Sequence, residues 1–474
     1  MIRKVNLLAN LDWFTVALYV ILVMMGWFNI YAAVYNEEHS SILSFSQRYG
    51  KQLMWICAAF CLAVFVFLLD SKFYTNLAYL LYGFTLLLLF LVLVIGSSIK
   101  GSQSWIVIGG FQIQPTEFAK IGTCLALARW LGAENQVFMN WKTLAVSIFI
   151  VFIPMALIML QPDTGSTLVY FSLLFMFYRE GLPGTILFSG FLVALLFVLS
   201  MVMDDLTLMI IILSIGFIIS LFMSLRIKQL VIGWGILAVL LIMIAFATGH
   251  DVEEIDYSQV IVITSVIAGI IFLVWSFIKR NKRIATLTCF VFGAILLCFS
   301  VEYVFDNIME PHQQQRVRIL LGLESDPLGY GYNVNQSKIA IGSGGWLGKG
   351  FLQGTQTKYN FVPEQSTDFI FCTVGEEWGW VGSSTVVLLF TVLLIRLVIL
   401  AERQRSVFSR VYAYGVVSIF FFHFLINIGM ALALLPVIGI PLPFFSYGGS
   451  SLWAFTILLF ILLRLDASRM ELLR

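Results

Sequence analysis

Apolar stretches about 20 residues long follow one another along almost the whole chain, and each is long enough to cross the hydrocarbon core of a membrane. Hydrophobic residues make up 60% of the 474 residues and charged residues only 11%, whereas a soluble domain averages roughly 45–50% and about 25%. We therefore predict an all-α polytopic membrane protein. The formal net charge of +2 gives no reason to expect nucleic-acid binding.

The apolar stretches also predict where the membrane helices lie. Because a span needs about 20 apolar residues, we predict about fourteen helices. Their expected ranges are 13–34, 52–69, 74–96, 116–132, 143–161, 164–179, 184–203, 206–225, 229–248, 260–278, 284–303, 381–400, 411–435 and 451–466. Lys and Arg favour the cytoplasmic side of a membrane. Their distribution predicts that both termini are cytoplasmic and that one large polar loop, residues 304–380, is extracytoplasmic.

Within this predicted single membrane domain, 1–474, two kinds of region stand out. Residues 184–303 have short loops and few charges, which is typical of a scaffold or a lipid-facing annex. Helix-breaking residues gather instead at 161–165 and 435–451. Non-helical backbone at membrane depth survives only where protein or water satisfies its polar groups. We therefore expect these two turns and the large loop to line one outward-facing cavity.

Asp368 stands where the polar loop meets the apolar run of the next helix. A carboxylate at such a boundary is partly removed from water, which raises its pKa and makes it a better proton acceptor for a bound hydroxyl group. An aspartate before an apolar run is also a common helix N-cap. The position alone favours neither role.

Basic residues and glycines share the same loop. The cations are Arg316, Arg318, Lys338 and Lys349, and the last two flank the glycine-rich run 342–348. Glycines let backbone N–H groups approach an anion closely, and Lys or Arg supplies charge, so the combination suits a phosphate or diphosphate. The same residues are ordinary in exposed turns, so this pattern is weak by itself.

Four more residues lie at the mouths of predicted helices. Glu117 and Lys120 are three positions apart and can meet on one helix face, either in a functional site or as a structural ion pair. Trp105 can stack on a sugar ring or anchor the chain at the membrane interface. Asp163, which follows a proline, is either a helix N-cap or a cavity-lining carboxylate.

Histidine and cysteine offer no sign of a metal site. The four histidines are scattered, and we expect no catalytic role for them. The six cysteines lie in or beside apolar spans and are expected to be small core residues without disulfides.

Several short motifs resemble those of the SEDS family, named for shape, elongation, division and sporulation. In the large loop they are ESDPLG at 324–329, QSKIAIGSGG at 336–345, GKG at 348–350, QGTQ at 353–356, FVPE at 361–364 and TDFIF at 367–371. Elsewhere they are QPTEFAK at 114–120, QPD at 161–163 and PLPFFSYGGSS at 441–451. The order GTQ before FVPE is more similar to the elongation, RodA-like branch of the family than to its division, FtsW-like branch.

The resemblance implies a fold and an activity. It implies a core of ten membrane helices, so the surplus of about four is expected within 184–303. The implied activity is that of a peptidoglycan glycosyltransferase that polymerises lipid II at the outer face of the cytoplasmic membrane. The implied partners are lipid II with the nascent glycan strand, a class B penicillin-binding protein, and other membrane proteins of the elongation machinery.

The resemblance also implies roles for particular residues. The putative catalytic aspartate of the family falls on Asp368. The characteristic loop tryptophan of the family falls on Trp105, and Glu117, Lys120 and Asp163 match polar residues of its central cavity. The full set of residues that we expect to bind substrate is Trp105, Glu117, Lys120, Asp163, Arg316, Arg318, Lys338, Lys349, Glu364 and Ser446. We expect Asp368 to take a proton from the 4-hydroxyl of the acceptor sugar, which attacks the anomeric carbon of the donor as the lipid diphosphate departs. The loop cations, together with a divalent cation such as Mg²⁺ or Mn²⁺, are expected to neutralise the departing diphosphate.

Two other functions compete with this one. A flippase for the same lipid-linked precursor would carry charged groups along a path through the bilayer, but the charges of this chain gather near the outer face or in loops. A non-enzymatic adaptor would explain the helices, but not the glycines and cations around Asp368.

Overall fold

A computed structural model describes residues 8–35, 45–99, 102–108, 111–133, 140–222, 227–248, 257–307, 309, 314–315, 318, 331–359 and 361–469. The chain divides into two compact units, one formed by Met1–Pro183 with Pro327–Arg474 and the other by Gly184–Asp326. The second unit begins at the first residue of the predicted insertion and extends beyond residue 303.

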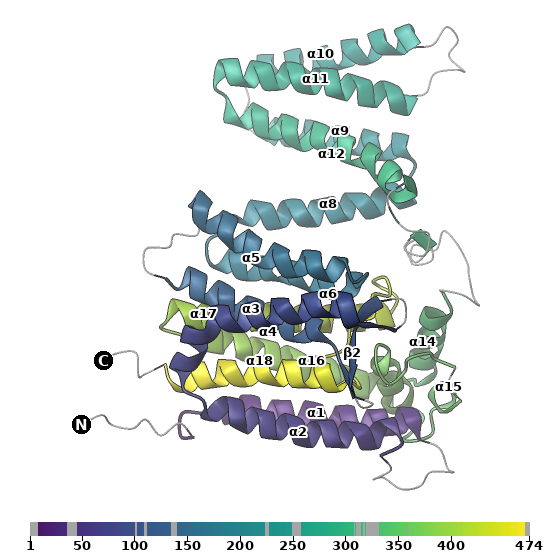
Figure 1. Ribbon diagram of the computed structural model, residues 1–474. Coiled ribbons are helices and arrows are strands. Elements are labelled where there is room, and N and C mark those ends of the chain that lie inside the picture. Colours follow the sequence, from purple (N-terminus) through teal and green to yellow (C-terminus); the bar gives the residue numbers. More distant parts are fainter. Residues whose placement is uncertain are drawn as a thin grey trace. The chain divides into compact units, whose positions relative to one another are not determined.

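The first unit consists mainly of long helices (Figure 1). They are α1 (Trp13–Val34), α2 (Arg48–Leu68), α3 (Ser71–Ile95), α4 (Pro115–Leu131), α5 (Trp141–Met159), α16 (Ile370–Glu402), α17 (Val407–Ala431) and α18 (Gly449–Ala467). Shorter helices are α6 (Thr164–Val169), the 3-10 turn η1 (Tyr170–Ser172), α7 (Leu173–Arg179), α14 (Tyr332–Ser343) and α15 (Thr355–Lys358). The predicted helix 164–179 is thus interrupted by η1.

The second unit contains five helices among its described residues. They are α8 (Gly184–Val202), α9 (Asp205–Phe222), α10 (Ile227–Thr248), α11 (Tyr257–Lys279) and α12 (Lys282–Asn307). Their buried apolar side chains form a core of their own, around residues such as Leu208, Met209 and Ile295. The unit therefore packs as a separate helical body.

Eleven helices in the described part of the chain are long and apolar enough to cross a membrane. The prediction of a multi-pass helical membrane protein is confirmed at this level, whereas the number fourteen and the positions of the termini stay predictions. Helix α4 falls outside the eleven because it is shorter and carries Glu117, Lys120 and Arg129. It is nevertheless almost wholly buried and packs against α3, α5, α17 and α18.

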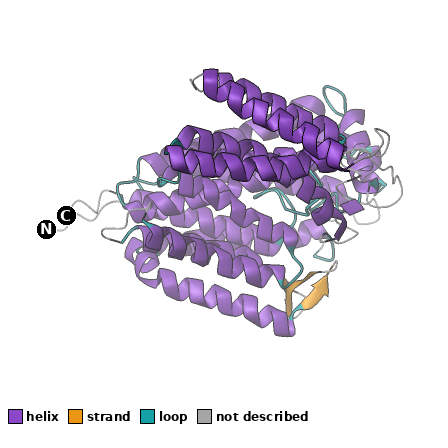
Figure 2. Cartoon of the chain, turned by 90° about the horizontal axis from the view of Figure 1, so that it is seen from above, coloured by secondary structure: helices purple, strands orange, loops and turns teal. Residues whose placement is uncertain are grey.

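The prediction of an all-α protein is wrong in one detail, because the structure also contains strands. Three short antiparallel strands, β1 (Ser97–Ile99), β2 (Ser102–Ile108) and β3 (Phe111–Ile113), pair in the order β1-β2-β3. Figure 2 shows them as a small sheet at the ends of the helices. Strand β3 contacts α18, and β2 contacts α4, so the sheet lies where those helices begin. Apolar periodicity missed it because the strands are very short.

Helix α16 is broken at Gly379, whose φ of 62° and ψ of −156° are not helical. The loop 344–350 packs into this break and supplies backbone hydrogen bonds. The Trp380 N–H donates to Gly345 O at 2.9 Å, and the Val381 N–H donates to Trp346 O at 3.1 Å. The Lys349 N–H donates in turn to the carbonyl of Glu376 at 3.0 Å. The break lies two residues before the predicted start of the span at 381. Because the loop supplies hydrogen bonds at the break, it is a structural part of α16.

Candidate active site

The start of α6, the turn at 435–448 and the loop segment of Asp368 lie next to one another, whereas the outward-facing cavity expected there stays a prediction. A Cβ on Gly165, at the start of α6, would lie 2.7 Å from the carbonyl oxygen of Ile438. Gly439 follows Ile438 in the chain, and a Cβ on Gly439 would lie 3.5 Å from Asp368 Oδ2. Gly439 has a φ of 78°, a conformation that favours glycine. The turn at 435–448 therefore lies between the start of α6 and the Asp368 carboxylate.

Asp368 itself is half-buried in the turn that leads into α16. The N-cap alternative is wrong, because α16 starts at Ile370, its cap residue is Phe369, and no side chain caps it. The main-chain carbonyl of Asp368 accepts a 2.9 Å hydrogen bond from Asn427 Nδ2. The backbone of this residue is thus fixed to α17, while its carboxylate faces the turn at Gly439.

Asn427 and Ser446 connect the loop to the turn. Asn427 is fully buried, and its Nδ2 donates to Ile440 O at 2.8 Å as well as to Asp368. The Ser446 hydroxyl donates to Thr367 O at 2.6 Å and accepts from the Leu442 N–H at 2.9 Å. Ser446 is buried and bonded on both sides within the protein, so here it positions the backbone beside Asp368, although we expected it to bind substrate.

Glu117 and Lys120 meet as predicted and form a buried ion pair of 2.8 Å. A third partner of this pair, His423, was not predicted. Lys120 Nζ lies 3.0 Å from His423 Nε2, and His423 Nδ1 lies 3.0 Å from the carbonyl oxygen of Pro441. Because that carbonyl can only accept, Nδ1 carries the proton and Nε2 accepts from Lys120. The group links α4 through α17 to the same turn that faces Asp368.

Asp163 and Trp105 lie near the start of α4. Asp163 is the N-cap of α6, since its carboxylate accepts from the Ser166 N–H at 3.0 Å, and it also accepts from Gln114 Nε2 at 3.2 Å. The N-cap alternative is therefore confirmed for Asp163. Trp105 is half-buried in β2, opposite Ser97 of β1.

Among the predicted cations, Lys349 is already paired. Its Nζ lies 2.7 Å from Glu376 Oε1, and that carboxylate is fully buried. Glu376 also accepts from the N–H groups of Gln356 and Thr357 at 2.8 and 2.9 Å, so it holds the start of α15. Lys349 thus helps to fix the loop against α16.

The other loop cations belong to different parts of the chain. Lys338 is exposed on α14. Arg318 belongs to the second unit, where its guanidinium carbon lies 5.4 Å from the centre of the Phe305 ring. Arg316 lies outside the described residues. The prediction that these cations together bind a phosphate or diphosphate therefore stays a prediction.

The glycines of the loop have a packing role that the sequence analysis weighed only as a general alternative. A Cβ on Gly344 or Gly348 would lie 2.0 Å from the carbonyl oxygen of Gly375 or Glu377, respectively. Only glycine lets the loop approach α16 this closely. Gly344 and Gly348 are therefore explained by packing against the broken helix, without a bound anion.

Glu364 stabilises the turn that contains Asp368. It has a φ of 56°, and its carboxylate accepts from the Thr367 hydroxyl at 2.8 Å. Its carbonyl oxygen accepts from the N–H groups of Thr367 and Phe369. We expected Glu364 to bind substrate. In the structure, its contacts stabilise this turn.

The described residues do not fit a metal site made by the protein alone. No group of three or more His, Cys, Asp or Glu side chains among them could hold a metal ion. The divalent cation stays a prediction, and a cation at Asp368 can also take oxygen ligands from phosphate and water.

Three residues that organise this site were not predicted, namely His423, Asn427 and Glu376. All three are buried polar residues inside helices. Polar residues in membrane helices mark functional or structural contacts by default, and for His423 and Asn427, which lie in the predicted span 411–435, that signal was available in the sequence. Glu376 lies before the predicted span at 381, so no such signal was available for it. The partners of these residues could not be predicted, because His423 and Lys120, for example, are 303 positions apart.

Comparison with known proteins decides the family. The model of the cell cycle protein family FtsW/RodA/SpoVE matches residues 12–226 and 215–471. The chain belongs to this family. The resemblance to SEDS proteins is thereby confirmed.

Curated members of the FtsW/RodA/SpoVE family carry enzyme names. The chain is 30% identical over 468 residues to the peptidoglycan glycosyltransferase RodA of Treponema pallidum (strain Nichols), a match that covers 98% of this chain and 100% of the relative. It is 31% identical over 385 residues to the peptidoglycan glycosyltransferase MrdB of Escherichia coli (strain K12), with 81% and 76% covered.

Solved structures of the family have the same fold. A chain of a peptidoglycan synthase complex that coordinates polymerization and crosslinking matches with a TM-score of 0.63 and 27% identity, covering 97% of this chain and 99% of that one. The rod shape determining protein RodA of Thermus thermophilus matches with a TM-score of 0.55 and 23% identity, covering 97% of each.

Proposed function

We propose that this protein is a peptidoglycan glycosyltransferase of the cytoplasmic membrane that polymerises lipid II into β-1,4 glycan strands during cell elongation and the maintenance of rod shape. Family membership and relatives named as peptidoglycan glycosyltransferases support the reaction class. The match to a RodA protein over nearly the full length of both chains supports the elongation role.

The observation that carries the mechanism is the fixed position of Asp368 where three non-helical segments meet. Its backbone is held by Asn427, while its carboxylate faces the turn at Gly439. In the proposed reaction, Asp368 accepts the proton of the acceptor 4-hydroxyl as that oxygen bonds to the anomeric carbon of the donor. The bond from this carbon to the diphosphate oxygen breaks, and the lipid diphosphate leaves with the electron pair. A positioned general base contributes roughly 10²–10⁴ in rate.

Substrate binding is proposed for the half-buried or exposed polar groups around this point. Trp105 and Asp163 flank the start of α4, and Lys338 is an exposed cation on α14. Arg316, Arg318 and Lys349 remain candidates for contact with the diphosphate. A divalent cation, Mg²⁺ or Mn²⁺, would supply further positive charge to the leaving group when bound.

A crosslinking partner fits the same proposal. Because the chain shares its fold with a subunit of a synthase complex that coordinates polymerization and crosslinking, we propose a class B penicillin-binding protein as its partner. The polymerase site would then face the extracytoplasmic side, where crosslinking takes place.

The decisive test compares the native protein with Asp368→Asn, each with and without the cognate class B penicillin-binding protein, on labelled lipid II in vesicles. We expect glycan strands from the native protein and a loss of roughly 10²–10⁴ in rate for Asp368→Asn, with unchanged thermal unfolding. Near-native polymerisation by folded Asp368→Asn would exclude its role as the base. Movement of lipid II across the vesicle membrane without strand formation would identify a flippase.

A further inference from the structure

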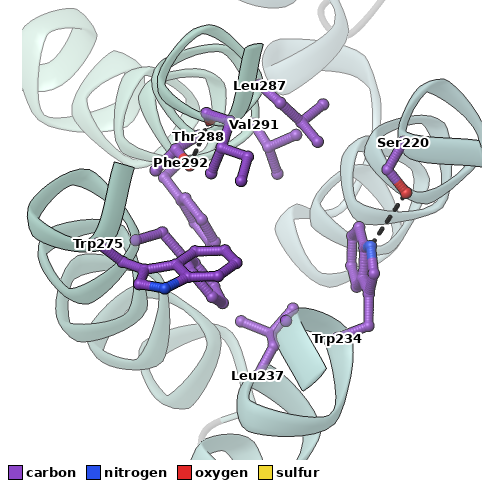
Figure 3. A pocket seen from close by; sticks show the side chains of 11 residues that line it. Ser220, Trp234, Leu237, Trp275, Leu287, Thr288, Val291 and Phe292 are labelled. Carbon is purple, nitrogen blue, oxygen red and sulfur yellow. Dashed lines mark hydrogen bonds between the residues drawn. The ribbon is translucent and has the colours of Figure 1, made fainter. Parts of the chain in front are cut away.

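The second unit contains a pocket that the proposed reaction does not use. It lies among α9, α10, α11 and α12 and is partly open to its surroundings. The side chains of Trp234 and Trp275 lie on opposite sides of this space in Figure 3, with Leu237 and Val291 between them. Leu237 and Val291 are buried, whereas both tryptophans are half-buried, so the pocket reaches the outside of the helices.

The lining is apolar, and its hydroxyl groups are used within the protein. The Ser220 hydroxyl donates to Phe217 O at 2.6 Å and accepts from Trp234 Nε1 at 3.1 Å. The Thr288 hydroxyl donates to Ile284 O at 2.8 Å. No charged side chain lines the pocket. A water molecule needs two to four polar partners, so this space is poorly suited to hold one.

The surroundings of the pocket determine which occupant fits. Helices α9, α11 and α12 are long and apolar enough to cross a membrane, so hydrocarbon chains surround them. An extended peptide would bring backbone N–H and C=O groups that find no partners here. A lipid tail has no such groups, and it gains dispersion contacts with the aromatic rings of the lining.

We propose that this pocket binds the hydrocarbon tail of a membrane lipid. The tail enters between the two tryptophans and lies against Leu237 and Val291. The shared chemistry is a flexible apolar chain, which can belong either to a phospholipid or to a polyprenyl phosphate. The proposal does not depend on Asp368 or on polymerase activity.

Two glycines of α10 provide a matched pair of variants. A Cβ on Gly233 would meet only two ring carbons of Phe272, at 3.7 and 3.9 Å, which is ordinary contact. Gly233→Leu therefore fills the pocket without a backbone clash. A Cβ on the exposed Gly235 would meet no heavy atom within 4 Å, so Gly235→Leu makes the same change outside the pocket.

The experiment uses the full chain in vesicles with a phospholipid that carries a photoreactive group on its acyl chain or, in a second arm, a polyprenyl phosphate tagged in the same way. Labelled residues are identified by mass spectrometry, with and without excess untagged lipid. We expect saturable labelling of the pocket lining that falls severalfold in Gly233→Leu but not in Gly235→Leu. The arm that gives this pattern identifies the source of the tail.

Labelling that excess untagged lipid does not compete, or that is equal in all three proteins, would overturn the proposal. Circular dichroism establishes that both variants keep their helices. If Gly233→Leu does not fold, the native protein alone decides the question by the ratio of labelling at the pocket lining to labelling on the exposed face of α10 around Gly235, because nonspecific contact with bulk lipid labels the exposed face at least as strongly.

Discussion

At the scale of single residues, the candidate site depends on buried polar side chains that hold backbone in place. Asn427 spans two segments by donating both to Asp368 O and to Ile440 O. His423, one turn earlier on α17, bonds to Pro441 O in the same turn. Alanine at such a position leaves buried carbonyl groups without a donor, at a cost of about 1–3 kcal/mol for each group. The geometry of the candidate site therefore depends on α17 as much as on the loop that contains Asp368.

Asn427→Ala should slow polymerisation because the backbone of Asp368 loses its anchor. Small displacements of a catalytic group cost up to roughly 10²-fold in rate. We expect kcat to fall by about that factor, with a smaller change in KM, when rates are measured over a range of lipid II concentrations. The matched control is Asn29→Ala, because Asn29 is also buried and its side chain, among the described residues, bonds to Met25 of its own helix. Equal losses in the two variants would contradict a specific role for Asn427.

At the scale of elements, the most demanding feature is the break in α16. Gly379 occupies a backbone region that is accessible essentially only to glycine. The main-chain groups near the break are satisfied by the loop 344–350 instead of by the helix itself. The loop and the helix consequently form one structural element made from two parts of the chain.

Gly379→Ala should destabilise the protein strongly. The new Cβ would lie 2.3 Å from the Gly348 nitrogen, and the backbone conformation itself would be strained by about 1–3 kcal/mol. We expect a clear fall in the melting temperature in detergent. The control is Gly293→Ala in α12, where a Cβ meets no heavy atom within 4 Å and helix propensity predicts a gain of about 0.5–1 kcal/mol. A native melting temperature for Gly379→Ala would refute this account of the break.

The sequence predicted most helices well because hydropathy reports directly on the apolar surroundings of a span. The structure has a helix at each of the expected ranges, although the helix at 164–179 is interrupted by a 3-10 turn. The sequence did not predict the strands at 97–113 or the helical residues of α16 before Gly379, because short elements carry little periodicity. For the site, it brought Glu117 and Lys120 together because they share a helix. It could not find His423 or the pairing of Lys349 with Glu376, because tertiary packing alone brings those residues together.

At the scale of the whole molecule, the number of helices in the second unit governs the orientation of everything after it. The unit contains α8 to α12. We infer that four of these helices are additional to the ten of the family, and an even number leaves the later helices facing as they do in relatives. The basic residues near the ends of α16, α17 and α18 favour one side of the membrane.

Deletion variants test this parity. Removal of α9 to α12 should leave a fluorescent reporter at the C-terminus active in the cytoplasm. Removal of α8 to α12 takes away an odd number of spans, so the reporter should be lost or the protein should insert poorly against its charge pattern. Reporter fluorescence and protein amount in membranes are the measurements. Equal cytoplasmic signals from both variants would show that the helices do not all cross the membrane.

The break in α16 also has a consequence for how the protein is made. A chain is synthesised from its N-terminus, so the loop that fills the break exists before the break itself. The carbonyl groups of Gly345 and Trp346 are already present when the N–H groups of Trp380 and Val381 emerge. Unsatisfied backbone is costly in a membrane, and here each late donor meets an acceptor made earlier. The order of the chain thus lets biosynthesis complete a discontinuous helix without waiting for any later segment.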